Sequence, residues 1–276
     1  MKYLCDFHTH TSHCDGKNSP REMAERALAL GFSAYGFSGH GGAGRTPTSQ
    51  MSAEAEAKYI SEVLSLRDEM RGRMDVLLGV EEELDGKKYR TRRSDPSSPF
   101  DYVIGGVHVI DVGGGFAPID LSPDNITDAT ERYFGGDFES LAEAYFSKVK
   151  RIPEAVDATF IAHIDLVSKY RDILPITFGK RYYEAAFDAV RALIPYNIPF
   201  EINVGAISRG YRTTPYPDEQ ILRYIRALGG EVMVNGDCHS AGMLGRYLDL
   251  GEELALRCGF THKVIITPDG LDKVEM

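Results

Sequence analysis

Histidine and acidic side chains recur at the points where apolar runs of this chain end. Seven of the eight histidines lie at or near the expected C-terminal ends of separate strand-like runs, and most have an acidic neighbour. These short segments, called stations here, are Asp6-Phe7-His8-Thr9-His10 with Asp15 close behind, Ser38-Gly39-His40, Gly79-Val80-Glu81, Gly106-Val107-His108, Ala162-His163-Ile164-Asp165 and Gly236-Asp237-Cys238-His239. One such histidine alone would more often be an ordinary polar residue. Their joint placement predicts a polynuclear metal site.

The spacing within two stations suits ligands that converge on one ion. Alternate residues of a strand face the same side, so His8 and His10 point the same way, as do Asp237 and His239. A mixture of imidazole and carboxylate suits Zn, Mn or Fe, whereas Mg or Ca would be bound almost entirely by oxygen. The sequence has no Cys-x-x-Cys pair, which disfavours a structural zinc knuckle.

The elements that must position these residues alternate between short apolar runs and amphipathic stretches. This rhythm predicts an α/β fold in which seven or eight parallel strands form a closed or nearly closed barrel. At 276 residues, one domain spanning 1–276 is expected. The expected strands are Tyr3–His8, Ala34–Ser38, Val76–Glu82, Tyr102–Ile110, Ala158–His163, Pro199–Val204, Glu231–Asn235 and Lys263–Ile266. The expected helices are Pro20–Leu30, with Ser19 as N-cap and Gly31 as the stop, Ser52–Arg71, Phe138–Lys150, Lys180–Leu193, Asp218–Leu228 and Ala241–Cys258.

Two loops are expected to overhang the site, because each follows a strand that ends in a proposed ligand. Residues 111–130 are rich in Gly and Pro, and residues 85–100 carry a basic run. That run could steer phosphate or could simply be a solvated surface. Its members are Lys87, Lys88, Arg90, Arg92 and Arg93.

Charge and composition restrict the partners. Against 41 acidic residues the chain has 31 basic ones, a net charge of -10 that disfavours a broad nucleic-acid or membrane surface. No apolar run approaches the ~20 residues of a membrane span, so a cytoplasmic protein is expected. The four cysteines, Cys5, Cys14, Cys238 and Cys258, are expected to be reduced. Cys14 and Cys238 are either soft metal ligands or small residues beside the ligands.

The ordered motifs, from residue 6 to about residue 240, resemble those of the PHP (polymerase and histidinol phosphatase) superfamily. Glu201-Ile202-Asn203 and Tyr216-Pro217 are similar to its histidinol-phosphate phosphatase branch. The resemblance implies a distorted (β/α)7 barrel with three divalent ions, Zn, Mn or Fe, at the C-terminal face of its strands. Glu81 would be the bridging carboxylate, with Glu82 on the opposite strand face. The implied ligands are His8, His10, Asp15, His40, Glu81, His108, His163, Asp237 and His239.

The implied chemistry is hydrolysis of a small phosphate monoester. L-histidinol phosphate, cleaved to L-histidinol and phosphate in histidine biosynthesis, is the expected substrate. Water shared by divalent cations can lose its proton near neutral pH. Asp165, two residues beyond His163 on the same strand face, would either protonate the leaving alkoxide or orient a ligand histidine. Arg209 and Arg212 would either clamp phosphate, with Arg209 acting in catalysis, or lie on the surface.

Some positions depart from the branch. Ser208 stands about where its members carry Arg, so the basic contact could move to Arg209. Asp15 occupies a position that often holds a third histidine; His13 could substitute or could be a neighbour of the site. His262 lies away from every motif and is expected to be structural or at the surface. The alternatives are a PHP-type phosphodiesterase or nuclease and a metal-binding barrel without catalysis. The oligomeric state is open.

Overall fold

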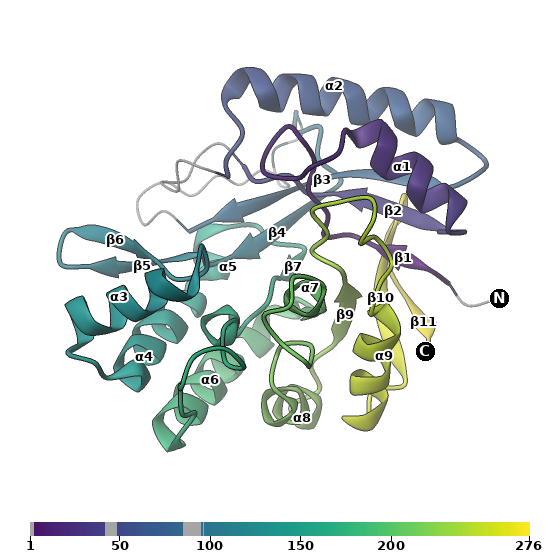
Figure 1. Ribbon diagram of the computed structural model, residues 1–276. Helices are drawn as coiled ribbons and strands as arrows, with labels where there is room; N and C mark the ends of the chain where they lie inside the picture. Colours follow the sequence, from purple (N-terminus) through teal and green to yellow (C-terminus); the bar gives the residue numbers. More distant parts are fainter. Residues whose placement is uncertain (1–2, 42–48, 85–94, 96) are drawn as a thin grey trace.

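Seven parallel strands form the centre of the molecule, and their order in the sheet follows their order in the chain (Figure 1). The structure is a computed structural model that describes residues 3–41, 49–84, 95 and 97–276. The strands are β1 (Cys5–Asp6), β2 (Ala34–Phe37), β3 (Asp75–Glu83), β4 (Tyr102–Gly106), β7 (Phe160–Ile161), β8 (Phe200–Asn203) and β9 (Val232–Asn235).

The two outer strands of this sheet meet just beyond their ends. Thr9 forms a parallel bridge with Cys238, in which the backbone N–H of His10 donates to the Cys238 carbonyl at 2.8 Å. The Asp6 carboxylate accepts the backbone N–H of Gly236 at 3.0 Å on the same seam. These contacts bring β1 against β9, and they confirm the prediction of a nearly closed barrel of seven or eight strands.

Helices surround the strands. In Figure 1, α1 and α2 cover one side of the barrel, and α4, α6, α8 and α9 lie around the other. As predicted, Ser19 caps α1, and its side chain forms a reciprocal capping box with Glu22. The longer helices are α1 (Pro20–Ala29), α2 (Ala53–Met70), α3 (Pro123–Phe134), α4 (Phe138–Val149), α6 (Lys180–Leu193), α8 (Glu219–Ala227) and α9 (Leu248–Arg257). The short ones are α5 (Ile152–Ala155), α7 (Gly205–Ser208) and the 3-10 turns η1 (Leu166–Ser168) and η2 (Ile194–Tyr196).

One tyrosine fills the barrel interior beside two glycines. The Tyr102 hydroxyl donates to the carbonyls of Phe7 and Phe37, each at 2.8 Å. A Cβ atom at Gly79 would lie 2.2 Å from the Tyr102 ring, and one at Gly36 would lie 2.4 Å from its hydroxyl. Only glycine therefore leaves room for this ring between β2 and β3.

A C-terminal hairpin covers the end of the barrel at which the strands begin. Strands β10 (His262–Thr267) and β11 (Gly270–Glu275) pair antiparallel. Val264, Ile265 and Ile266 of β10 pack with Phe7 and Phe160 in a buried apolar cluster. The single strand predicted over Lys263–Ile266 is thus one half of a hairpin, and the opposite end of the barrel is free to carry a site.

The structure also differs from the predicted elements in two other parts of the chain. The strand expected over Tyr102–Ile110 ends at Gly106, and the loop expected over 111–130 contains structure instead. An antiparallel hairpin there, β5 (Val109–Val112) with β6 (Gly115–Pro118), turns at two glycines with positive φ and is followed by α3. The helix expected over Ala241–Cys258 begins only at Leu248, because the preceding residues form turns in which Gly245 and Tyr247 have positive φ. The basic run of residues 87–93 lies outside the described residues.

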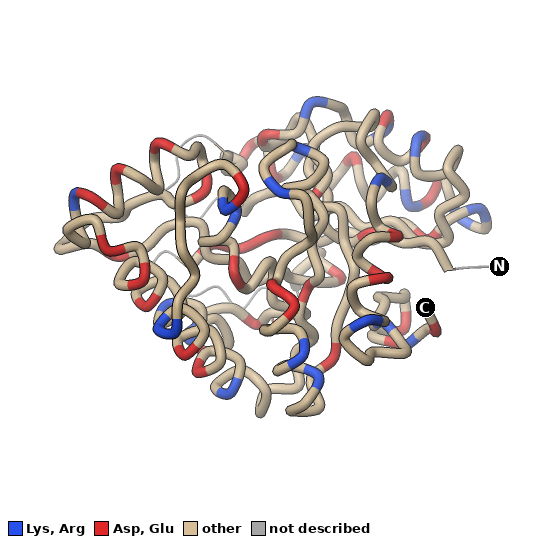
Figure 2. The backbone as a smooth tube through the Cα atoms, turned by 60° about the horizontal axis from the view of Figure 1, so that its bottom comes forward, with Lys and Arg blue, Asp and Glu red and all other residues tan. Residues whose placement is uncertain are grey.

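Charges of both signs are interspersed over the outer helices, as Figure 2 shows. None of the helices among the described residues combines the length and the apolar character that crossing a membrane requires.

Candidate metal centre

All nine predicted ligands come together at the ends of the strands. Among the described residues they form four groups of side chains whose candidate ligand atoms lie within 4.8 Å of one another. The groups are His10, Asp15, His40 and His239; His8, His163 and Asp237; His8, His10 and Glu81; and Glu81, His108 and His163. Every member is one of the nine. The strands therefore converge on one cluster of potential metal ligands.

Glu81 lies at the middle of this cluster. One of its oxygens, Oε2, lies 3.2 Å from His8 Nε2, 3.6 Å from His10 Nε2 and 3.1 Å from His40 Nδ1. The other, Oε1, lies 3.3 Å from His108 Nε2 and 3.2 Å from His163 Nε2. A carboxylate with each oxygen facing a different set of imidazoles has the geometry of a bridging ligand.

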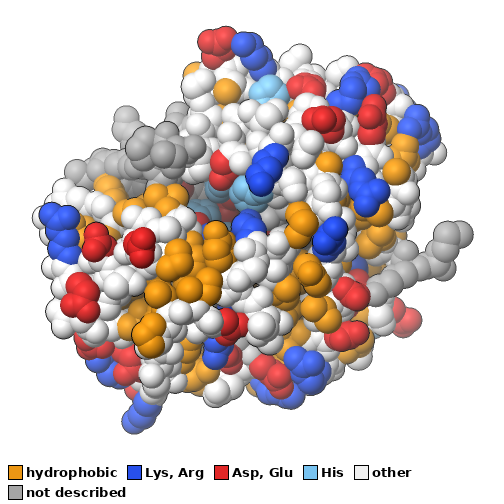
Figure 3. Space-filling model, in the orientation of Figure 1, with side chains coloured by type: hydrophobic (Ala, Val, Ile, Leu, Met, Phe, Trp, Pro, Cys, Tyr) orange, Lys and Arg blue, Asp and Glu red, His pale blue; other side chains and the backbone are white. Residues whose placement is uncertain are grey.

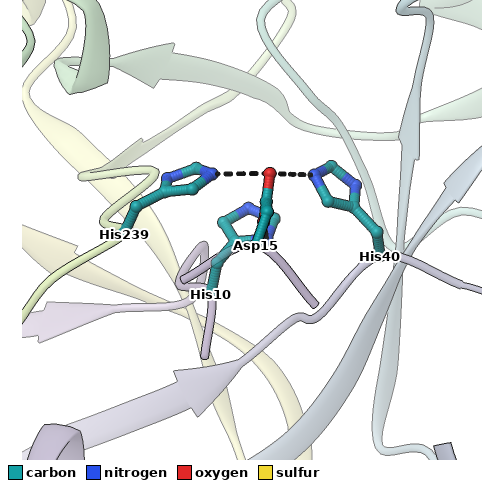
Figure 4. A group of neighbouring side chains, drawn as sticks. All are labelled: His10, Asp15, His40 and His239. Atoms are coloured by element: carbon teal, nitrogen blue, oxygen red, sulfur yellow. Dashed lines mark ion pairs between the residues drawn. The ribbon is translucent and has the colours of Figure 1, made fainter. Parts of the chain in front are cut away.

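Asp15 is the counterpart of Glu81 on the outer side of the cluster. Figure 4 shows its carboxylate between the rings of His239 and His40, with His10 beneath it. Asp15 Oδ2 lies 3.4 Å from His239 Nε2 and 3.6 Å from His40 Nε2, and Oδ1 lies 3.6 Å from His10 Nδ1. The position that departs from the phosphatase branch therefore faces three histidines.

Several buried atoms of the cluster lack a hydrogen-bond partner within the described structure. They are Nε2 of His8, Nε2 of His10, Oε2 of Glu81 and Nδ1 of His163. A buried polar atom without a partner is costly, and such atoms usually bind water or an ion. Because these atoms belong to imidazole and carboxylate groups that converge, the residues fit divalent ions of the Zn, Mn or Fe type.

Two further carboxylates orient the histidines. Glu201 accepts from His8 Nδ1 at 2.7 Å and from the backbone N–H of His163 at 2.9 Å. The amide groups of Asn203 and Asn235 donate to the same carboxylate at 2.9 and 3.0 Å. Such hydrogen bonds fix the ring orientation and raise the basicity of a ligand histidine. Glu201 was noted in the sequence only as part of a motif, and no role was predicted for it.

Glu83 orients His108 by hydrogen bonding, a role that was not predicted from the sequence. Its carboxylate accepts from His108 Nδ1 and from the His108 backbone N–H, both at 2.8 Å. Strand alternation could have predicted this role, since Glu83 lies two residues after Glu81 and therefore on the same face of β3.

Burial and neighbouring charge set the protonation of the cluster. Burial opposes the charged form of His8, but the carboxylates of Glu201 and Glu81 outweigh it and raise its pKa well above the usual range. The pKa of His108 is raised in the same way, chiefly by Glu81. Burial and the positive charges of His239 and His40 lower the pKa of His10 to about 3. Without metal, the cluster thus holds protons on some of its histidines.

A cavity of about 580 Å³ opens over these ligands. Figure 3 shows histidine side chains in a hollow, with Lys or Arg side chains beside it. Lys17, Lys169 and Arg209 contribute positive charge to the wall, while Leu121 and Tyr211 contribute apolar surface. Lys and Arg side chains in the wall, beside a cluster of candidate metal ligands, suit a small anionic ligand. A second cavity, of about 420 Å³ between α3 and α4, has none of the predicted site residues in its lining.

Lys169 and Asp120 form a pair in the cavity wall that the sequence did not reveal. Lys169 Nζ donates to the Asp120 backbone carbonyl at 2.7 Å and lies 3.3 Å from its Oδ2. The Lys169 residue is only 7% exposed. Asp120 falls within a segment expected to be a loop, and Lys169 follows His163 by six residues. The two residues are far apart in the sequence and come into contact only in the folded chain.

The three residues predicted to act on substrate occupy different places. Arg209 lines the cavity and donates to Asp237 Oδ2 at 2.9 Å and to the Asp237 carbonyl at 3.2 Å. Arg212 is 3% exposed and lies outside the cavity lining, which favours a structural role. Burial raises the pKa of Asp165, as would suit a proton donor, but the residue is completely enclosed and also lies outside the lining. This placement does not favour a proton donor. The Asp165 carboxylate accepts from Ser168, Tyr182 and Asp218 and from none of the ligand histidines of the described structure, so the predicted alternative, in which it orients a histidine, is not seen either.

His13, the four cysteines and His262 lie outside the four groups of candidate ligands among the described residues. His13 Nε2 lies 2.9 Å from Glu62 and belongs to none of the ligand groups. All four cysteines are free; Cys14 Sγ lies 3.7 Å from His10 Nδ1, and the Cys238 thiol donates to the Ser240 carbonyl. His262 is exposed, next to Thr261.

The fold and the cluster together define a parallel barrel with a cluster of candidate metal ligands at the C-terminal ends of its strands. The chain belongs to the PHP domain family, whose model matches residues 6–205.

Two relatives that are similar to this chain over most of its length are named as histidinol-phosphatases. A Deinococcus radiodurans protein named as a probable histidinol-phosphatase is 28% identical over 262 residues, which span 92% of this chain and 94% of the relative. The histidinol-phosphatase of Bacillus subtilis is 23% identical over 256 residues, 87% of this chain and 95% of the relative.

A solved structure has the same fold. The histidinol phosphate phosphatase of Lactococcus lactis, complexed with Zn, L-histidinol and phosphate, superposes with a TM-score of 0.68 at 21% identity. The match covers 97% of this chain and 98% of that one.

Proposed function

We propose that this chain is a metal-dependent phosphatase that hydrolyses L-histidinol phosphate, or a closely similar small phosphate monoester, to the alcohol and inorganic phosphate. The observation that carries the proposal is the convergence of nine imidazole and carboxylate ligands beneath a cavity lined by Lys169 and Arg209. The family and the names of the relatives support it, as does the Lactococcus lactis complex.

Three divalent ions fit the grouping of the ligands. One would be held by the Asp15 group with His10, His40 and His239, and one by His8, His163 and Asp237. A third would be held by His108 and Glu81, the carboxylate that the groups share. His163 belongs to this group and to the second one, and it would complete only one of them, because a neutral imidazole ligates one ion. When bound, such ions make water acidic near neutral pH and neutralise charge on a phosphoryl group.

The side chains of the cavity wall would bind and orient the substrate. The Arg209 guanidinium can offer two parallel N–H groups to phosphate oxygens, and its contact with Asp237 fixes it at the edge of the cluster. Lys169, also in the cavity lining, adds a second positive charge near the bound phosphate. Asp120, also in the lining, would face the cationic end of an amino alcohol such as histidinol.

A phosphate-release assay tests the proposal. The protein, loaded with Zn, Mn or Fe, is offered L-histidinol phosphate, p-nitrophenyl phosphate and a single-stranded oligonucleotide. We expect kcat/KM for the monoester of histidinol to exceed that for the oligonucleotide by at least ~10-fold, because the cavity admits a small ligand. Comparable or faster cleavage of the oligonucleotide would support a nuclease, and no phosphate release with any metal would support a barrel without catalysis.

A further inference from the structure

The Asp165 carboxylate lies where three segments of the chain meet. Its Oδ2 accepts from the Ser168 hydroxyl at 3.2 Å, from the Tyr182 hydroxyl at 3.3 Å and from the backbone N–H of Asp218 at 3.0 Å. Ser168 ends the η1 turn, Tyr182 belongs to α6, and Asp218 is the N-cap of α8. One buried oxygen therefore joins a turn, a helix and the end of a loop.

Two of these segments contribute side chains to the cavity wall. Lys169 directly follows η1, and its backbone N–H donates to the Leu166 carbonyl at 2.8 Å. The loop that ends at Asp218 carries Arg209 and Tyr211, both in the cavity lining. The side chains that would contact a phosphate monoester thus extend from segments that meet at Asp165.

Arg212 adds further hydrogen bonds at the place where these segments meet. Its guanidinium donates to the Ser168 hydroxyl at 2.6 Å and to the Pro215 carbonyl at 3.2 Å, and it lies over the Tyr216 ring at 5.1 Å. Asp165 and Arg212 therefore hold the Ser168 side chain from two sides. Both residues are buried, so water competes little for these hydrogen bonds.

We propose that Asp165 is a positioning residue: it holds the η1 turn and the 209–218 loop together, so that Lys169 and Arg209 face the phosphate. It does not itself exchange a proton with the substrate. The inference rests on the proposed phosphatase function only in taking phosphate as the group that Lys169 and Arg209 bind. A carboxylate that accepts three hydrogen bonds at a buried joint can fix both segments closely enough to matter, since small misplacements of binding groups are costly.

The test compares Asp165→Asn with the wild-type protein, both loaded with metal. Asn keeps the size of the side chain and can keep an oxygen at the position of Oδ2, but it removes the negative charge that strengthens the three hydrogen bonds. We expect inorganic phosphate to bind about 10-fold more weakly by calorimetry, because the weakening of three such hydrogen bonds costs roughly as much as the loss of one. In turnover, KM should rise by a similar factor for L-histidinol phosphate and for p-nitrophenyl phosphate, with metal content unchanged.

Other roles of Asp165 give other results, and each would overturn the proposal. A proton donor would slow only the alkyl phosphate, because p-nitrophenolate leaves without a proton. A residue that holds a metal ligand would lower the metal content. Unchanged phosphate affinity would show that the joint does not position the binding groups.

A second variant keeps the proposal testable if Asp165→Asn folds poorly. Tyr182→Phe removes one of the three donors and leaves the buried ring in place, so it should weaken phosphate binding in the same direction by a smaller factor. Tyr35→Phe is the matched control, because Tyr35 is also a fully buried tyrosine but lies on β2, packed against Phe32 and Phe37. Phosphate affinity is measured without turnover, so failure of the phosphatase assay and failure of this inference are distinguishable.

Discussion

Carboxylates decide the charge of the histidines around the cavity. Glu81 and Asp237 have pKa values well below the usual range, despite burial, because positive groups surround them. They stay ionised at neutral pH and in turn raise the pKa of His8. In the metal-free protein, the cluster is therefore a set of ion pairs in which protons occupy nitrogen atoms that a metal would need.

Metal binding at pH 7 should release protons from these histidines. The pKa values of His8 and His108 are raised well above the usual range, chiefly by the nearby carboxylates against the effect of burial, and that of His40 is raised too, so the protonated form of these residues is favoured. A ligand imidazole must be neutral, so the arriving ion displaces these protons. Calorimetry of Zn binding in two buffers of different ionisation enthalpy should show net release of about one proton or more per chain. The release should shrink as pH rises above the raised pKa values, and a heat independent of buffer would contradict this prediction.

Arg209→Lys should impair the enzyme although the positive charge is kept. The lysine ammonium cannot reproduce two parallel N–H groups. Loss of one hydrogen bond to a charged group corresponds to a fall in kcat/KM of roughly 10- to 100-fold for L-histidinol phosphate. Because Arg209 also contacts Asp237, metal content is measured in parallel. The control is Arg191→Lys, at an exposed position of α6, which should leave kcat/KM unchanged.

At this scale the sequence predicts residues that repeat a local pattern and misses those that meet through the fold. The nine clustered side chains follow strand ends, and strand alternation relates His8 to His10. Lys169 and Asp120 lie 49 positions apart and have no shared pattern. The roles predicted for Asp165 and Arg212 depended on proximity in sequence to the site, which says little about the direction of a side chain.

Among the elements, the barrel strands show how one large side chain dictates small neighbours. Tyr102 on β4 occupies the space next to Gly79 on β3 and Gly36 on β2. Gly79→Ala should lower the free energy of unfolding by about 1–3 kcal/mol or more, because the new methyl group overlaps the ring. Urea denaturation measures the change. Gly242→Ala is a suitable control, since a Cβ there meets nothing within 4 Å, and an equal effect of both substitutions would contradict the packing argument.

Helix starts were predictable because their chemistry is local, whereas chain reversals after a ligand were not. Ser19 with Glu22 is a capping pair that can be read directly in the sequence. The apolar run of residues 102–110 gives no sign of ending at Gly106. It ends there because Glu83, on the neighbouring strand, accepts the backbone N–H of His108, and the chain then pairs with itself as β5 and β6.

In the whole molecule, the metal-binding cluster joins almost every strand of the barrel at its open end. The candidate ligands follow β1, β2, β4, β7 and β9, and Glu81 lies near the end of β3. Strand β8 contributes Glu201, which orients His8. The opposite end is held by the apolar residues of β10. Ions bound at the cluster would therefore act as cross-links between strands that are otherwise joined by few hydrogen bonds, such as β7, which has two residues.

Removal of metal should lower the melting temperature of the whole protein. Ligands that bind only the folded state stabilise it, and one site held at 100-fold its Kd adds about 2.7 kcal/mol. For a chain of this size that corresponds to about 5–10 °C for each ion removed. Elemental analysis of the loaded protein should give about three ions per chain, and calorimetric melting after chelation should show the loss in temperature. Asp237→Asn should lower both the ion count and the effect of the chelator. Fewer than two ions at saturating Zn, Mn or Fe, with a melting temperature that chelation leaves unchanged, would contradict a trinuclear centre that cross-links the barrel.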